Sequence, residues 1–188
     1  MLALVLWSLT AYSGPPASDI KEAQDAVIKL MESMNGKKGN VKGQVAAIKK
    51  KFTDLEPIMY VYKPRKKGGL GMGKDGDSIE IVIGKIGDPK SKVWTAKKRL
   101  DTRKELARVA ELSRAVAEVT DAYAKQYKDN NGAGKVNPAE WKEFADKMRQ
   151  GADELSKAAK GDDADKIQKA ANNLSASCTD CHAKFRSD

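Results

Sequence analysis

The last helix-length segment of the chain carries apolar side chains at alternating steps of three and four residues. This spacing places them along one face of an amphipathic helix. The face is made up of Ala164, Ile167, Ala171, Leu174, Cys178, Cys181 and Phe185. Because both cysteines continue an apolar face, we expect their chemistry on the interior side of a helical protein.

These are the only two cysteines in 188 residues, and His182, the only histidine, directly follows the second of them. The pattern C-x-x-C-H is the attachment sequence of a c-type haem. Its thiols bond the haem and its imidazole becomes the proximal iron ligand. Small residues just before the motif leave room for a porphyrin. We therefore predict one covalent haem c held by Cys178 and Cys181, with His182 as the iron ligand.

Two other uses of the motif compete with haem attachment. A structural zinc site needs four protein ligands, whereas this motif supplies three and the chain has no second cluster. A thioredoxin-like thiol pair normally accompanies a βαβ pattern, which the sequence lacks. A zinc or dithiol protein without haem stays an alternative.

The N-terminal segment is typical of a secretory signal peptide. Residues 2–12 are apolar and uncharged, and small or helix-breaking residues follow at 13–18. The apolar run is shorter than the ~20 residues that span a bilayer. We assign 1–17 as the signal, with cleavage after Ser13 or Ala17, and 18–188 as a single domain of an exported, periplasmic protein without stable membrane insertion. A buried N-terminal helix or an uncleaved anchor is the alternative.

The rest of the chain predicts an all-α fold. Helical periodicity is found at 19–34, 41–62, 91–128, 138–160 and 162–186. Pro57 is expected to kink the second of these helices or to restart it. A short helix capped by Asp77 or Ser78 is predicted at 78–86. The glycine-rich segment 63–76 predicts an exposed loop, and it lacks the Gly-Lys-Ser/Thr ending of a phosphate loop.

The motif ends a helical chain and continues with Phe185 and Arg186, which resembles the class II c-type cytochromes, the cytochrome c prime superfamily. The resemblance is specific in the last helix and extends, more weakly, back to about Pro138. It implies an antiparallel four-helix bundle with the haem between helices at one end. The bundle helices would be 41–62, 91–128, 138–160 and 162–186, with the helix at 19–34 and the glycine-rich loop as additions.

The resemblance also implies a role for Arg186 as a basic residue near the proximal imidazole. From the sequence alone, Arg186 is equally well explained as a cation that stabilises the C-terminal end of a helix. Dimers are common among such bundles, so a homodimer is one further implication. The sequence itself shows no unambiguous exposed apolar stripe for it.

The sixth iron ligand decides the finer function. No second histidine exists, and a lysine would first have to lose its proton. A methionine would raise the reduction potential and give a low-spin electron carrier. Met59 is the first candidate because it lies on the predicted apolar face of the helix at 41–62. The alternatives are Met31, Met34 and Met72, or a vacant position that would suit NO or CO, while Met148 is better explained as core.

The charge pattern limits the partners. Lys and Arg outnumber Asp and Glu by 35 to 26, but no nucleic-acid-binding motif accompanies them. Two basic runs could be solvated faces or a docking surface for an acidic redox partner. They comprise Lys63, Arg65, Lys66 and Lys67, and Lys97, Lys98 and Arg99. No paired carboxylates or nucleophile–base set stands out, so we expect a one-electron carrier rather than an enzyme.

Overall fold

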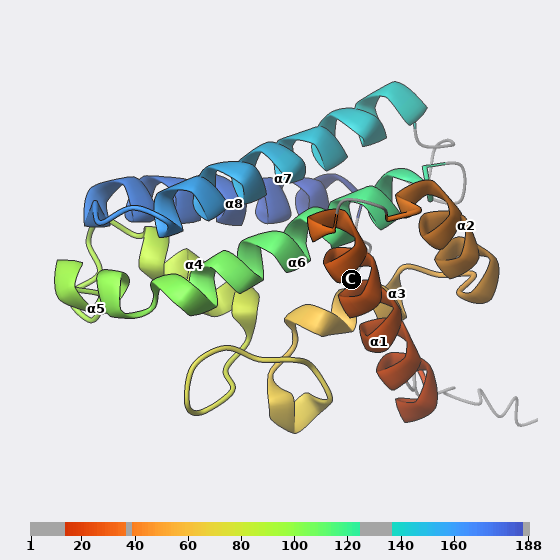
Figure 1. The fold of residues 1–188 in the computed structure, drawn as a ribbon, viewed down its shortest axis with the longest axis horizontal. Helices are drawn as coiled ribbons and strands as arrows, with labels where there is room; N and C mark the ends of the chain where they lie inside the picture. Colours follow the sequence, from red (N-terminus) through yellow and green to blue (C-terminus); the bar gives the residue numbers. More distant parts are fainter. Residues whose placement is uncertain (1–13, 37–38, 125–136, 186–188) are drawn as a thin grey trace, which may run out of the picture.

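The computed structural model describes residues 14–36, 39–124 and 137–185. Within these ranges the chain forms α-helices, two short 3₁₀ helices and one isolated β-bridge between Met72 and Asp77 (Figure 1). The elements are α1 Ala17–Asn35, α2 Val41–Lys51, α3 Glu56–Met59, η1 Tyr60–Tyr62, η2 Arg65–Lys67, α4 Ile79–Gly87, α5 Ala96–Asp101, α6 Arg103–Asp121, α7 Pro138–Ala159 and α8 Ala164–Phe185. The predicted all-α class is confirmed. No described helix is both long and apolar enough to cross a membrane.

Three long helices, α6, α7 and α8, pack side by side as antiparallel neighbours. Trp141, in the first turn of α7, donates its indole N–H to the Thr120 carbonyl near the end of α6, at 2.8 Å. The same indole packs on Phe185 at the end of α8, with ring centroids 4.9 Å apart. Since the start of α7 meets the ends of both neighbours, α7 runs antiparallel to each. Their apolar faces form the core, in which Leu155 and Ile167 are completely buried.

The fourth side of the bundle is shared by two helices from the N-terminal half. Helix α4 lies along α8, while α1 crosses α6 (Figure 1). A Cβ added to Gly87 would lie 2.5 Å from the backbone nitrogen of Asn172, so only glycine allows this approach of α4 to α8. Gly84 faces Ser175, and Glu80 faces His182, so α4 also runs antiparallel to its neighbour. The predicted antiparallel four-helix bundle is confirmed.

The expectation that a single segment, 41–62, would supply the fourth side is wrong. The chain there breaks into α2, α3 and η1, and α2 packs chiefly against α1. Pro57 lacks the backbone N–H that a continuous helix needs, so it stands in the first turn of a new helix instead. The Asp54 carboxylate accepts the Glu56 backbone N–H at 2.7 Å and starts that helix.

The long helix predicted at 91–128 is also divided. Helix α5 begins only at Ala96, where the Thr95 hydroxyl accepts the Lys98 backbone N–H. Thr102 then adopts φ −91° and ψ 0°, which separates α5 from α6. The Thr102 hydroxyl donates to the Lys98 carbonyl at 2.8 Å, so a local hydrogen bond accompanies the break. The described part of α6 ends at Asp121.

The remaining helix starts agree with the sequence, with one exception. The Asn137 side chain caps α7, where Pro138 is the first residue, and Asp163 caps the start of α8. The short helix predicted at 78–86 is confirmed as α4, and Ser78, one of the two predicted caps, occupies its N-cap position but makes no capping hydrogen bond. Its hydroxyl donates instead to the Tyr62 carbonyl at 3.0 Å, which ties α4 to η1.

The glycine-rich segment is anchored rather than fully exposed. Residues 65–68 are exposed, but the Met72 side chain is only 1% exposed and belongs to the core. Met72 and Asp77 exchange two backbone hydrogen bonds of 2.8 and 3.0 Å. Gly71 and Gly76, with φ of 58° and 67°, make the left-handed turns that bring these two residues together.

Candidate haem-attachment site

The two cysteines lie in the last two turns of α8 and are not joined in a disulfide. Burial raises the pKa of the Cys178 thiol to about 12, and the charge of Glu80 adds to the shift. Burial also raises the pKa of the Cys181 thiol to about 11. Cys181 packs at the edge of the hydrophobic core. Both sulfurs therefore face the apolar side of α8, as the helical spacing predicted.

The His182 side chain is 34% exposed and lies against the first turn of α4. Its Nδ1 atom is 3.5 Å from Oε1 of Glu80. The ring nitrogen that faces Glu80 is thus Nδ1, and Nε2 is left for another partner. An iron ligand of this kind uses one ring nitrogen and donates the N–H of the other.

A buried hydroxyl from the N-terminal half lies close to Cys178. Burial raises the pKa of Tyr62 well above its usual value, and the charge of Cys178 raises it further. The Ser113 hydroxyl on α6 is near enough to lower this pKa, yet the Tyr62 hydroxyl completes no hydrogen bond of normal geometry with the described residues. Segments η1, α4, α6 and α8 therefore converge around Cys178.

These side chains fit a covalently bound haem. The donor set is two neutral thiols and one imidazole on consecutive turns of one helix, and the unpartnered Tyr62 hydroxyl is buried beside them. Cys178 and Cys181 would bond the porphyrin, and Nε2 of His182 would bind iron. Within the described ranges, no group of three or more His, Cys, Asp or Glu side chains is arranged to hold a bare metal ion.

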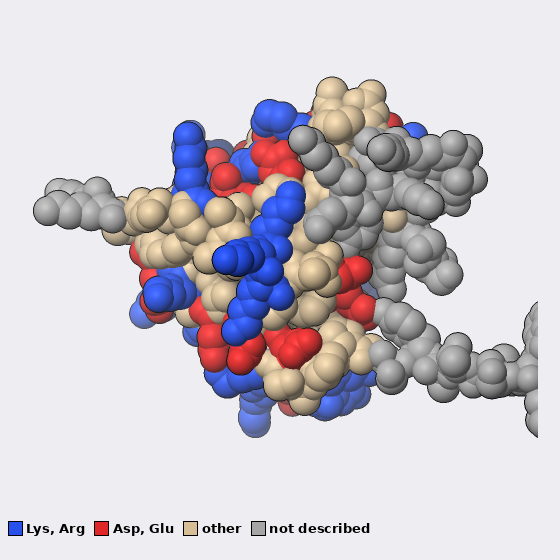
Figure 2. Space-filling view, turned by 90° about the vertical axis from the view of Figure 1, so that its right-hand side faces the viewer, with Lys and Arg blue, Asp and Glu red and all other residues tan. Residues whose placement is uncertain are grey.

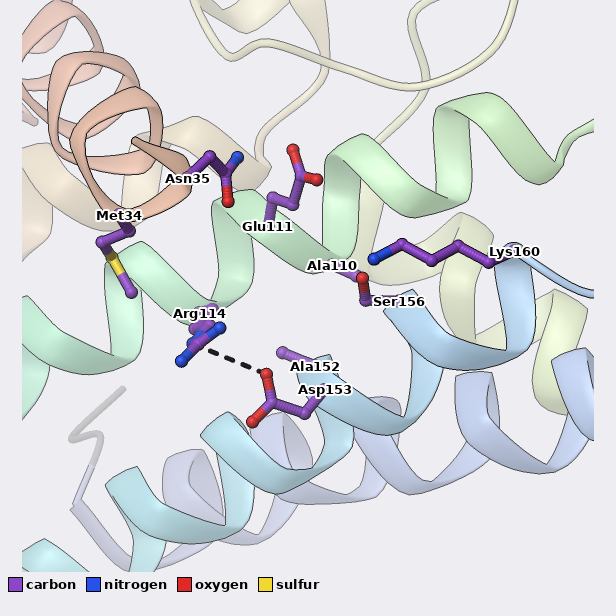
Figure 3. Close-up of a pocket in the computed structure, with 9 residues that line it drawn as sticks. All are labelled: Met34, Asn35, Ala110, Glu111, Arg114, Ala152, Asp153, Ser156 and Lys160. Carbon is purple, nitrogen blue, oxygen red and sulfur yellow. Dashed lines mark ion pairs between the residues drawn. The ribbon is translucent and has the colours of Figure 1, made fainter. Parts of the chain in front are cut away.

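Two small cavities lie in other parts of the molecule. One, of about 90 Å³, lies between α1, α6 and α7, where Arg114 and Asp153 form an ion pair of 3.5 Å (Figure 3). The other, of about 200 Å³, lies beside Met72 and Trp94. Both are smaller than the ~300–1,000 Å³ of typical cofactor pockets. The candidate site is thus defined by its donor side chains, not by a preformed cavity.

The predicted methionine ligand lies near the edge of the core. Met59, the last residue of α3, is partly exposed and packs against the core from its rim. The Tyr62 hydroxyl, one turn later, is buried, and Cys178 is one of the causes that raise its pKa. Met31 and Met72 are buried core residues, and Met34 lines the cavity of Figure 3. Met148 is buried in the core, as predicted. The role of Met59 stays a prediction.

The other predicted surface residues have mixed outcomes. Arg186 lies outside the described residues. Arg99 was expected in a basic run, but it is only 7% exposed and donates to the Ile86 carbonyl. In the other run, Arg65, Lys66 and Lys67 are exposed. On the face shown in Figure 2, basic and acidic side chains are interspersed.

Sequence reasoning missed two residues of this site, Tyr62 and Glu80. Tyr62 was assigned only to an apolar helical face. Glu80 is the one acidic residue within the isoleucine-rich helix α4. A single acidic residue in such an apolar helix indicates a special position. The sequence does not predict which other helix this residue will face.

Residues 91–186 match the family model of cytochrome c'. No curated protein and no solved structure matches the chain. The matched region is just over half of the chain and contains α5 to α8 together with the C-x-x-C-H motif. Because the family match, the bundle and the position of the motif agree, the chain belongs to the cytochrome c' family and is a haem-binding cytochrome.

Proposed function

We propose that the protein is an exported mono-haem cytochrome that carries single electrons, with one haem c bonded to Cys178 and Cys181 and coordinated by His182. The observation that carries this proposal is the position of the motif at the edge of the bundle. Cys178, Cys181 and His182 are all partly buried. A group held between them is anchored in the core and still reachable by a redox partner.

The bound haem supplies the one-electron couple, and the polypeptide holds it in place. The end of α8 is fixed for this task by aromatic packing and by an ion pair. Phe185 packs against Trp141 and, at 5.2 Å between ring centroids, against Phe144. Lys184 pairs with Glu140 at 3.1 Å. These contacts hold the turn that carries His182, and electron transfer requires no acid–base residue, so we propose no enzymatic role.

The direct test is intact-mass and absorption analysis of protein exported by a host that attaches haem c. We expect the mass of one haem in addition to the polypeptide, and a Soret band. The double variant Cys178→Ala/Cys181→Ala should lose both, while Thr179→Ala, at an exposed position between the two cysteines, should keep both. A bare polypeptide carrying zinc or two reactive thiols would contradict the proposal.

A second candidate function is the binding of NO or CO at an open iron position. The specific observation in its favour is that Met31 and Met72 are buried in the core and Met34 and Met59 pack against it, so every candidate methionine already has a packing role. A low-spin spectrum of the oxidised protein supports the electron carrier. A high-spin spectrum, together with rapid CO binding by the reduced protein, supports the second candidate.

The methionine variant Met59→Ala separates the two candidates further. If Met59 binds iron, its loss converts a low-spin spectrum to a high-spin one, because the thioether is the strong-field ligand. The control is Met148→Leu, a volume-conserving change in the core that should leave the spectrum as it was. An unchanged spectrum in Met59→Ala would move the ligand to Met72 or Met31, or to no methionine.

Export is part of the proposal, because members of this family are typically exported and the N-terminal segment is typical of a signal peptide. The apolar run at 2–12 lies outside the described residues. Sequencing the mature N-terminus tests it: we expect Gly14 or Ser18 as the first residue. A mature protein that starts at Met1 and stays in the cytoplasm would contradict export.

A further inference from the structure

One carboxylate from outside the region matched by the family model faces the predicted iron ligand. Glu80, in the first turn of α4, places Oε1 at 3.5 Å from Nδ1 of His182. The Glu80 side chain is 39% exposed and that of His182 is 34% exposed, so both are partly withdrawn from water. The contact joins α4 to the turn of α8 that carries the motif.

The packing of α4 fixes the backbone position of Glu80. Ile79, Ile83 and Ile86 are each at most 2% exposed, so this face of α4 is buried. Gly87 brings the far end of α4 against the backbone of Asn172, and the Ser78 hydroxyl ties the near end to the Tyr62 carbonyl. The helix therefore presents Glu80 to one place on α8.

The influence of Glu80 also reaches the neighbouring groups. Its charge is one of the causes that raise the pKa of the Cys178 thiol and of Tyr62. The carboxylate thus faces the attachment site as a whole, in addition to the imidazole. These effects on Cys178 and Tyr62 agree with the contact between Glu80 and His182, and they are independent of that contact.

A histidine that binds a metal almost always donates its other ring N–H to a carboxylate, a carbonyl or water. Such a partner fixes the orientation of the ring and raises its basicity as a ligand. A negative charge on this side also favours the more positive, oxidised iron, because opposite charges attract more strongly in a partly buried setting. The expected result is a lower reduction potential.

We propose that Glu80 is a positioning residue for His182: its carboxylate accepts the Nδ1–H and holds the reduction potential of the haem down. The proposal rests on the haem attachment proposed above. The 3.5 Å separation is longer than the 2.7–3.2 Å of an N–H···O hydrogen bond. Because both side chains are partly exposed, a small rotation of either one brings the two atoms into range. The region outside the family match would thereby tune the cofactor that the matched region binds.

The test compares four haem-loaded variants of the full chain: Glu80→Gln, Glu80→Asp, Glu80→Ala and Asp180→Asn. Each is first checked for one haem by mass and for wild-type helical content by circular dichroism. We expect Glu80→Gln to increase the ratio of reduced to oxidised protein at least tenfold at a fixed applied potential, which corresponds to about 59 mV for a one-electron couple. Glu80→Asp keeps the charge and should recover part of the shift.

Asp180→Asn is the matched control, because it removes one exposed negative charge within the motif but not at Nδ1 of His182. We expect a clearly smaller shift for it than for Glu80→Gln. A second readout is exchange of the His182 ring N–H with solvent, followed by NMR, which should be faster in Glu80→Ala than in wild type. A Glu80 that only added negative charge near the site would move the potential but would leave this exchange unchanged.

Equal shifts in Glu80→Gln and Asp180→Asn would overturn the proposal, since they would reduce Glu80 to one surface charge among others. Unchanged ring N–H exchange in Glu80→Ala would overturn it as well. Wild-type protein without haem is a different failure, visible before any variant is made, and it removes the proposed function together with this inference.

Discussion

The two halves of the molecule contribute to the candidate site in different ways. The C-terminal half, α5 to α8, matches the cytochrome c' family and carries all three residues of the attachment motif. The N-terminal half, α1 to α4, precedes that match, yet it supplies Tyr62 beside Cys178 and Glu80 beside His182. The C-terminal half therefore carries the residues of the motif, and the N-terminal half supplies side chains that lie around them.

The difference teaches that residues outside the family match can surround the motif that the match contains. The fourth side of the bundle here is a short helix, α4, pressed tightly against α8, together with α1 across α6. The hydrogen bond from the Ser78 hydroxyl to the Tyr62 carbonyl also brings η1 to the start of α4. The properties of the iron should then depend on residues that the family match does not include.

The strongest test of the C-terminal half is Phe185→Ala. Phe185 is 6% exposed and packs between Trp141 and Phe144. Its loss should lower the free energy of unfolding by about 3–5 kcal/mol, because it leaves a cavity at the end of α8. Denaturant unfolding measures the change, with the exposed Thr179→Ala as a control expected within ~0.5 kcal/mol of wild type. A loss below about 1 kcal/mol would mean that the end of α8 is held by something else.

The matching test of the N-terminal half is Gly87→Ala. The added Cβ would lie 2.5 Å from the Asn172 nitrogen, so α4 must move away from α8, at a cost of about 1–3 kcal/mol in stability. In Gly84→Ala the new Cβ would meet only the Ser175 hydroxyl, at 3.2 Å. That control should be neutral or slightly stabilising, because alanine favours a helix. Equal stability of the two variants in thermal unfolding would show that α4 is not packed closely on α8.

A smaller effect is expected from the basic residues of η2. We propose that Lys66 and Lys67, which are exposed, help to steer an acidic redox partner. Lys66→Glu/Lys67→Glu should slow reduction by such a partner several-fold at low salt and lose that effect at high salt, because screening removes long-range attraction. Stopped-flow kinetics measures this, and Lys97→Glu/Lys98→Glu tests the other run. If the rate of reduction of the wild type does not depend on salt, both basic runs are solvated surface and do not steer a partner.

Much of the C-terminal half could be predicted from the sequence. The apolar face of α8 and the two helices expected at 138–160 and 162–186 all appear as predicted. The errors fall where tertiary contacts compete with local preference. Ser78 bonds the Tyr62 carbonyl instead of capping α4, and Arg99 turns inward to the Ile86 carbonyl instead of facing water.

The sequence by itself determined the helical class and the position of the attachment motif on an interior face. Both follow from the spacing of residues three or four positions apart. In a helix, residues at this spacing lie next to each other on one face. Only the tertiary structure decided that α4 completes the bundle beside α8, and thus that Glu80 meets His182 and Tyr62 meets Cys178. These pairs join residues that are far apart in the chain. They form only because particular apolar faces pack closely together. The shape and burial of those faces decide that packing, and a local sequence pattern does not predict it.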